Sequence, residues 1–300
     1  MIAKEWRDAR WKFLLGVLAI LLFVVLAPRS YETIVAQTER EIGYIKKDLA
    51  TPGVAGAPEG MRPPPSHEEE QRQELEEIQR PDYPVRMAAW EMTDVHYGGN
   101  FLILAPLAGL LGVALVSGEV GRGSIFLLLA KPVGRTRALL TKYSVCAAIL
   151  FVVATLGVVG TLLSAYANGY PQESFRVAEI LTSSVLFWLG SLFVLGLALL
   201  SSVVFKDVIR SVVATVVVAY LIYTGPNLLL SLYAFWSFVT GSSPNDEQYM
   251  LFQRFYLFDY WTATDPSSGE WAATRNLIVC LVAAAVPLLV SLWLFRRKAY

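Results

Sequence analysis

Long apolar runs separated by short charged stretches dominate the chain. Six runs contain no Asp, Glu, Lys or Arg, and they approach or exceed the ~20 residues that a helix needs to cross a bilayer. They are residues 13–27 and 101–117, stretches within 143–172, 180–205 and 211–236, and residues 276–295. The strands of a membrane β-barrel would show shorter alternating runs. The pattern predicts an all-α polytopic membrane protein with six transmembrane helices.

The first run is short for a span, and its flanks are expected to extend it. Trp11 is suited to the membrane interface, and Lys12 can reach the headgroups with its long side chain. Residues 1–12 are predicted to form an amphipathic helix along the inner membrane surface. A secretory signal peptide is the alternative, because a basic start and an apolar core precede Ala27. Pro28, directly after that cleavage position, argues against cleavage.

The charged residues predict how the spans are oriented. One set of flanks, residues 1–12, 118–142, 206–210 and 296–300, holds 14 Lys or Arg and 4 Asp or Glu, whereas the remaining flanks hold 11 and 21. Short basic loops stay on the cytoplasmic side. We therefore expect a multi-pass plasma (inner) membrane protein with both termini in the cytoplasm.

The two polar segments on the opposite side differ in character. Residues 28–100 are predicted to form an extracytoplasmic helical hairpin, with helices at 31–49 and 66–80 separated by a Pro- and Gly-rich stretch. This hairpin would either recognise an extracellular ligand or accessory protein, or serve as a solvated spacer or dimer contact. Within residues 237–275, an aromatic cluster at 249–263 favours one or two interfacial or re-entrant helices, which would cap an exit path or anchor the loop in the headgroup zone.

The chain has 55% hydrophobic and 17% charged residues and no net charge. This composition offers few candidate catalytic or metal-binding residues. Cys146 and Cys280 fall in apolar runs and are predicted to be packing residues. His67 and His96 lie in the polar outer segment without a ligand cluster, so no metal site is expected and a surface position is favoured for His96.

No catalytic motif is visible, and this chain is expected to bind no cofactor. Gly118, Gly121 and Gly123 suggest a phosphate-binding loop, but Ser124 follows where such loops need a Lys-Ser/Thr pair. The basic residues are explained by orientation, so no nucleic-acid partner is expected. Because the six apolar runs lack carboxylates and basic residues, an ion-coupled carrier is not favoured. A transporter of this kind would take its energy from a cytoplasmic partner.

Polar and helix-breaking residues in the spans more often form kinks and interhelical hydrogen bonds than bind cargo. They include Pro106, Thr155, Thr161, Ser164, Pro226, Asn227 and Pro287. Gly157, Gly160 and Ser164 predict a close helix contact. No substrate site is assigned.

Residues 117–143, between the second and third spans, are predicted to form a short amphipathic helix in the cytoplasm. Gly121 and Gly123 allow a turn, Ser124 caps the helix and Pro132 ends it. Its apolar face is formed by Ile125, Phe126, Leu128 and Leu129. A short helix joined to two spans can pass a cytosolic motion into the membrane. The alternative is an ordinary amphipathic loop lying in the headgroups.

The same stretch carries the motif Glu119-x3-Gly123-Ser124-x2-Leu127-Leu128-x3-Pro132-x2-Arg135, followed by Lys142. It resembles the ABC-2 family of ABC transporter permeases. Gly134 stands where these proteins often have Ser, and Thr141 where Gly is frequent. Six spans with cytoplasmic termini also match, whereas a large outer segment occurs in some subfamilies only.

The resemblance implies the permease subunit of an ATP-driven exporter. Two permease subunits, as a homodimer or heterodimer, would form the pathway within the membrane lipids, and two separate ABC ATPase subunits would bind ATP and Mg²⁺. Residues 118–135 would be the coupling helix that docks on the ATPase. Its contact residues would be Glu119, Gly123, Ser124, Leu127, Leu128, Pro132 and Arg135.

Two other functions remain open. A membrane sensor or scaffold protein would use the outer hairpin to bind a ligand or partner, without transport activity. A membrane-embedded lipid enzyme would need a cluster of acids or histidines at the membrane face, and the sequence shows none.

Overall fold

The computed structural model describes residues 2–26, 28–50, 65–121, 123, 134–205, 207–240, 256–263 and 271–297. This part of the chain is built from helices joined by turns. They are α1 (Ile2–Leu26), α2 (Tyr31–Ala50), α3 (Pro65–Ile78), α4 (Tyr83–Ala114), α5 (Ser117–Gly121), α7 (Arg135–Ala167), η2 (Gln172–Ser174), α8 (Val177–Val204), α9 (Val208–Thr240), η3 (Leu257–Trp261) and α11 (Ala273–Arg297).

Six stretches of the described chain are long and apolar enough to cross a membrane, which confirms the all-α, six-span prediction. They are Ala9–Leu26, Tyr83–Ala114, Arg135–Ala167, Gln172–Val204, Val208–Ser237 and Ala273–Arg297. Most extend past the apolar runs, because polar residues near a helix end continue the same hydrogen-bond ladder. Helix α4 shows this most clearly, since it begins at Tyr83 rather than near Phe101.

Helix α1 is continuous, so the structure has no break between a surface helix at residues 1–12 and the first span. Neither Gly nor Pro occurs before Gly16 to interrupt it. A side chain at Gly16 would overlap Leu107 of α4, which shows how closely the two helices pack. Lys12 Nζ donates a hydrogen bond to Leu110 O at 2.8 Å. Lys12 therefore joins α1 to the end of α4.

Helix α8 lies among the other spans and packs against α4, α7, α9 and α11. Glycines allow two of these approaches. A Cβ on Gly112 of α4 would come within 2.7 Å of Leu195 O on α8, and a Cβ on Gly196 of α8 would come within 2.9 Å of Pro287 on α11. These positions have room only for glycine, so the backbones themselves set the spacing of the bundle.

The predicted close helix contact at Gly157 and Gly160 is confirmed. A Cβ at either position of α7 would come within 3.3 Å of α1, from Ile20 and Val24 respectively. Ser164 is buried one turn further on, where its carbonyl oxygen accepts a hydrogen bond from Asn168 Nδ2 at 2.8 Å. Small residues thus let α1 lie directly on α7.

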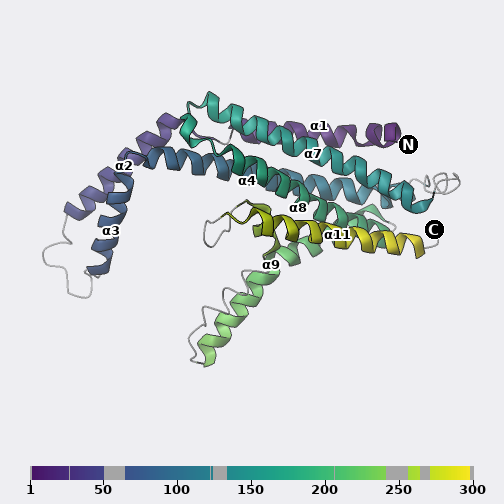
Figure 1. The fold of residues 1–300 in the computed structure, drawn as a ribbon. Coiled ribbons are helices and arrows are strands. Elements are labelled where there is room, and N and C mark those ends of the chain that lie inside the picture. The colour runs from purple at the N-terminus through teal and green to yellow at the C-terminus, as the bar shows by residue number, and fades with distance from the viewer. Residues whose placement is uncertain are drawn as a thin grey trace.

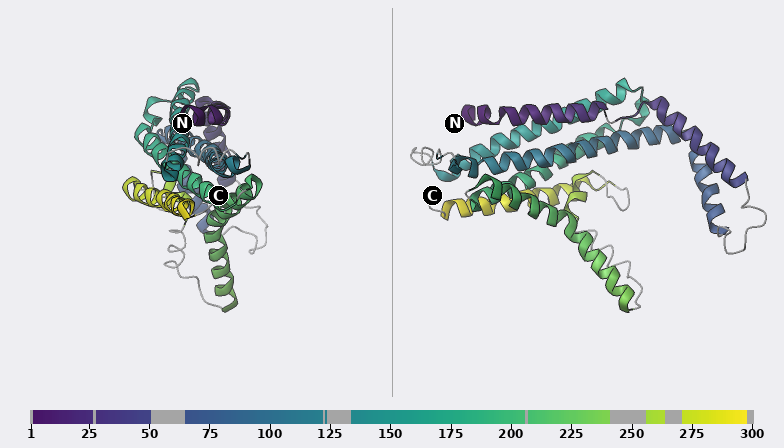
Figure 2. Two further views of the ribbon diagram at one scale, coloured as in Figure 1. Left: turned by 90° about the vertical axis from the view of Figure 1, so that its right-hand side faces the viewer. Right: turned by 180° about the vertical axis from the view of Figure 1, so that it is seen from behind.

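Both chain ends lie at one end of the bundle, which we call the terminal end (Figure 1). Arg296 Nε donates to Thr136 Oγ1 at 2.8 Å, which joins the last turn of α11 to the first turn of α7. Helices α2 and α3 project from the opposite end, which we call the arm end (Figures 1 and 2). The predicted outer hairpin is therefore present as a pair of helices, and it lies far from both termini.

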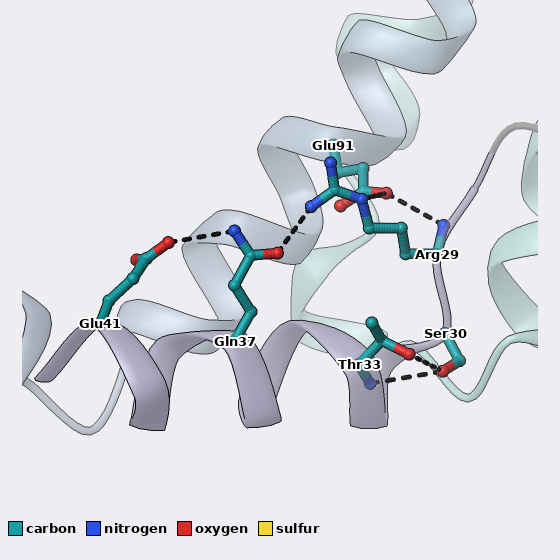
Figure 3. Close-up of polar contacts among 6 residues, drawn as sticks. All are labelled: Arg29, Ser30, Thr33, Gln37, Glu41 and Glu91. Atoms are coloured by element: carbon teal, nitrogen blue, oxygen red, sulfur yellow. Dashed lines mark hydrogen bonds and ion pairs between the residues drawn. The ribbon is translucent and has the colours of Figure 1, made fainter. Parts of the chain in front are cut away.

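The base of the arm is fixed to the bundle (Figure 3). The Arg29 backbone N–H donates to Glu91 Oε1 of α4 at 2.9 Å, and Arg29 Nη1 donates to Gln37 Oε1 of α2 at 2.7 Å. Tyr31 N donates to Asn168 O at 3.0 Å, between α7 and α8. An apolar cluster that includes Ile34 buries the first turns of α2. The arm thus leaves the bundle in a defined direction.

Helix α9 diverges from the other spans and points away from the bundle (Figures 1 and 2). Asp207 caps its start, where Oδ1 accepts from Ile209 N at 2.7 Å and from Arg210 N at 3.1 Å. Most of its large apolar side chains are exposed, including Val216, Tyr220, Leu228, Leu232, Phe235 and Trp236. In a membrane this surface would be covered by lipid or by another protein.

Candidate functional site

The candidate coupling site is the segment between α4 and α7 together with the first residue of α7, residues 115–135, and we call it the α4–α7 connection. It begins where α4 breaks at Leu115 and Val116. The amides of Val116 and Ser117 both donate to Ser202 Oγ of α8, at 3.1 and 2.7 Å, and Ser202 Oγ donates to Val113 O at 2.9 Å. One hydroxyl therefore satisfies the amides released by the break and ties the connection to α8.

A buried ion pair ties the same connection to α7. Glu119 Oε1 of α5 contacts Lys142 Nζ of α7, and the Lys142 side chain is only 2% exposed. A buried ammonium needs such a partner, because an unpaired charge in an apolar environment is costly. The sequence predicted Glu119 as an ATPase contact, but the structure directs its carboxylate toward Lys142. The pair positions α5 against α7, and the contact of Glu119 with an ATPase stays a prediction.

Gly123 and Arg135 also lie on this connection. Gly123 has φ +68°, a left-handed conformation that glycine adopts readily and that fits the predicted turn. Arg135 is the first residue of α7 and is exposed, after Gly134 in an extended conformation. The structure thus places Glu119, Gly123 and Arg135 on one connection at the terminal end. Ser124, Leu127, Leu128 and Pro132 lie outside the described residues, so the coupling helix itself stays a prediction.

Sequence analysis did not identify Ser202 or the pairing of Lys142. A signal existed for Lys142, because this residue follows Leu139 and Leu140 and lies seven residues into an apolar helix. A cation at such a position requires a counter-charge. For Ser202 the sequence offers no comparable signal, since serines are common in α8.

An apolar cleft of about 640 Å³ lies between α4 and α9. Its lining contains no charged side chain and consists of Phe101, Leu102, Ala105, Pro106, Gly109, Leu110, Val113, Val194, Val212, Thr215, Val216, Ala219, Tyr220, Tyr223 and Phe258. An aromatic cluster joins α4, α9 and η3 at this cleft. Phe258 lies 5.4 Å from Phe101 and 5.5 Å from Tyr223, measured between ring centroids. The cleft is suited to apolar groups.

The described part of the outer aromatic loop, residues 256–263, packs against the bundle, with Trp261 and Ala263 buried and most of the other residues partly exposed. Trp261 of η3 is 1% exposed and fills the space beside Gly190 of α8, where no Cβ would fit. Ala263 N donates to Ser183 Oγ at 3.0 Å, and Asn276 Nδ2 of α11 donates to Thr262 O at 2.9 Å. These contacts hold the described part of the loop against α8 and α11, and its role as the cap of an exit path or as an interfacial anchor stays a prediction.

His96 is buried, which corrects the predicted surface position. It lies on α4 with no exposed area, because α4 begins at Tyr83 and its arm-end half packs into the bundle. His96 Nε2 is 2.8 Å from Ser184 Oγ on α8, and Nδ1 is 3.2 Å from Thr161 Oγ1 on α7. The four-residue spacing from Met92 to His96 to Asn100 was the available signal for a buried helix face.

Within the described residues, no three His, Cys, Asp or Glu side chains come together as a metal site. Cys146 of α7 and Cys280 of α11 are both buried and form no disulfide with each other, which confirms their predicted packing role. Two features are thus the candidates for function: the α4–α7 connection at the terminal end and the apolar cleft between α4 and α9.

A family model described as an ABC-2 family transporter protein matches residues 1–299. The chain belongs to the ABC-2 transporter family. The matched range includes the arm as well as the spans. No curated protein matches the chain. Family membership identifies it as a multi-pass membrane component of a transporter, a permease, consistent with the six spans and with a protein that is not itself an enzyme.

Proposed function

We propose that this ABC-2 protein is the permease subunit of an ATP-driven exporter, and that separate ATPase subunits bind its α4–α7 connection. The observation that carries the proposal is the attachment of this connection. Ser202 holds it to α8, and Lys142 holds it to α7. Because α5 follows α4 after a two-residue turn, a force on the connection acts on three spans at once.

Helix α4 offers a direct route for such a force. It runs without interruption for 32 residues, which is about 48 Å at about 1.5 Å per residue. Along this length it lines the apolar cleft and then reaches the base of the arm, where Glu91 accepts from the Arg29 backbone. A displacement of α4 at the terminal end would therefore also move the lining of the cleft and the base of the arm.

The distribution of charge supports placing the terminal end in the cytoplasm of a plasma membrane protein. Exposed basic residues gather there, namely Arg135, Arg137, Arg210, Arg296 and Arg297. The arm carries an excess of acidic residues in α3. Short basic flanks are typical of the cytoplasmic side. ATP and Mg²⁺ would bind on the partner ATPase, below this surface.

The exposed face of α9 supports a second permease subunit as a partner. This helix diverges from its neighbours and, with α4, lines the apolar cleft. A second copy seated there would turn a lateral cleft into an enclosed pathway between two subunits. Either a homodimer or a heterodimer satisfies this geometry.

The proposal is tested by reconstituting the permease in nanodiscs with a candidate ABC ATPase, chosen by searching the genes next to that of the permease. The double variant Leu128→Asp, Arg135→Glu should lower permease-stimulated ATP hydrolysis by about 5- to 150-fold, the range of a coupling free energy of about 1–3 kcal/mol. Arg80→Glu, which makes the same Arg-to-Glu reversal at the exposed arm end, should leave hydrolysis unchanged. Wild-type hydrolysis in the double variant would contradict the proposal, and failure of any ATPase to bind would favour the sensor or scaffold function.

A further inference from the structure

A polar cluster lies inside the bundle toward the arm end, and the transport proposal does not use it. It consists of His96 and Asn100 on α4, Thr161 on α7 and Ser184 on α8, all of them buried. His96 is six residues from the exposed Trp90 toward the terminal end, which is about 9 Å along α4. Trp side chains favour the membrane interface, so the cluster lies within the bilayer. An ionisable side chain at such a depth is rare and usually functional.

The hydroxyl groups around His96 can serve either charge state of the ring. Ser184 Oγ is 2.8 Å from His96 Nε2 and 2.9 Å from Ile180 O, and Thr161 Oγ1 is 3.2 Å from Nδ1 and 2.9 Å from Gly157 O. Each hydroxyl has one hydrogen to donate. Beside a neutral ring, one hydroxyl donates to the bare nitrogen, and the other accepts from the ring N–H. Beside a charged ring, both accept, and each donates to its own helix carbonyl.

Among the residues that the structure describes, however, no charge around His96 is placed to balance a protonated ring. On α4 the neighbouring titratable ring is that of Tyr97, whose centroid lies 6.2 Å from the centroid of the His96 ring. On α7 the hydrogen-bond partner of the His96 ring is Thr161. On α8 the charged group nearby is Glu179, which accepts from Tyr97 Oη at 2.9 Å and pairs with Arg176 Nη1 at 3.4 Å. Its charge is thus engaged elsewhere.

Asn100 does not supply the missing charge either. Its Nδ2 donates to His96 O at 2.8 Å, and its buried Oδ1 has no hydrogen-bond partner among the described residues. A charge buried without a partner is disfavoured, whereas the same imidazole in water titrates near pH 6.5. Separation of α4 from α7 and α8 would admit water and make the charged ring favourable.

We propose that His96 is a proton-binding site in the arm-end half of the permease. It is neutral while α4 is packed against α7 and α8, as in this structure, and it binds a proton when these helices separate. The inference relies on the proposed function only for the side from which the proton arrives. Acidification below about pH 6.5 therefore favours the separated arrangement. For a single proton, the ratio of separated to packed molecules changes by at most tenfold per pH unit.

The protonation step can be observed directly, because the chain has only His67 and His96. The full-length His67→Gln variant, labelled with ¹⁵N-histidine in nanodiscs without ATPase, reports on His96 alone. We expect a neutral ring at pH 8 and an imidazolium at pH 5. A ring already charged at pH 8, or still neutral at pH 5, would overturn the proposal.

The conformational step is measured by the distance between spin labels at the arm ends of α4 and α7. Labels are placed on Trp90→Cys and Tyr166→Cys, both exposed positions, with Cys146 and Cys280 replaced by Ala. Lowering the pH from 8 to 5 should increase the longer-distance population, and His96→Gln should abolish this response. A distance that does not change with pH, or an unchanged response in His96→Gln, would overturn the proposal.

Ser184→Ala keeps the ring but removes one bond between α4 and α8. It should raise the longer-distance population at every pH and preserve the pH response. Thr155→Ala, which removes an exposed hydroxyl from the same helix as Thr161, is the matched control and should behave as wild type. If His96→Gln does not fold, an unchanged distance distribution in Ser184→Ala would still contradict the proposal. Because no ATPase is present, these results do not depend on whether ATPase coupling is correct.

Discussion

At the scale of single residues, the pair Glu119–Lys142 determines whether the α4–α7 connection is held in place. Replacing Lys142 with Met leaves Glu119 partly buried without its partner, so we expect a loss of about 3–5 kcal/mol in unfolding free energy. The double variant Glu119→Leu, Lys142→Met removes both charges and should recover most of that loss. Thermal unfolding in detergent measures both, and a single variant as stable as wild type would contradict the buried pair.

Gly190 and Gly109 form a matched pair for testing how η3, which contains Trp261, packs against α8. A Cβ at Gly190 would overlap the Trp261 ring, so Gly190→Ala should cost about 1–3 kcal/mol and expose Trp261. At Gly109 nothing lies within 4 Å, and Ala should stabilise α4 by about 0.5–1 kcal/mol. Unfolding midpoints and quenching of tryptophan fluorescence distinguish the two. Equal effects at both positions would mean that Trp261 is not seated as described.

Tyr170, between α7 and α8, tests the cost of an unpaired buried hydroxyl. Its Oη has no hydrogen-bond partner among the described residues, and burial raises the pKa of Tyr170 to about 12. Tyr170→Phe should therefore stabilise the protein by about 1 kcal/mol near pH 7. In the wild type, the preference for the neutral phenol is fully present below pH 10 and is lost as the pH rises toward 12. The phenylalanine variant should lack that loss, which unfolding measured at pH 9 and 11.5 would reveal.

At the scale of elements, the sequence predicted which segments are helical and one close contact, at Gly157 and Gly160, but not which helices pack against one another. The apolar runs were sufficient for six spans, because membrane length and composition act locally along the chain. The break that starts the connection depends on Ser202, which lies 85 residues away from Ser117. Likewise, the burial of His96 follows from α7 and α8 packing around α4. Such contacts between distant segments leave little trace in a single sequence.

The end of α4 illustrates a testable link between elements. Ser202→Ala would leave the Val116 and Ser117 amides without their acceptor, at a cost of about 1–3 kcal/mol. Thr224→Ala on the exposed side of α9 removes a hydroxyl that serves only its own helix, and it should have little effect. Limited proteolysis at the α4–α7 connection should accelerate in the first variant alone. Equal cleavage of both would show that Ser202 does not hold the connection.

At the scale of the whole molecule, the unequal exposure of the spans predicts where two permeases meet. Leu232 on α9 and Leu163 on α7 are each 64% exposed. If α9 faces the second subunit, Leu232→Cys should form cross-linked dimers in membranes far more readily than Leu163→Cys. The reverse order would place the subunit interface on another face. Mass-resolved gels of single-cysteine variants, with Cys146 and Cys280 replaced by Ala, provide the measurement.

The uninterrupted α4 links the arm to the end at which we propose that an ATPase binds. Suppose that a protein that binds α2 and α3 changes the affinity of the terminal end for the ATPase by some factor. Thermodynamic reciprocity then requires that the ATPase change the affinity of the arm for that protein by the same factor. Binding of an antibody fragment raised against the arm would then report the nucleotide state of the ATPase. The affinity of this fragment for the arm would rise or fall as ATP is hydrolysed on the far side of the bilayer.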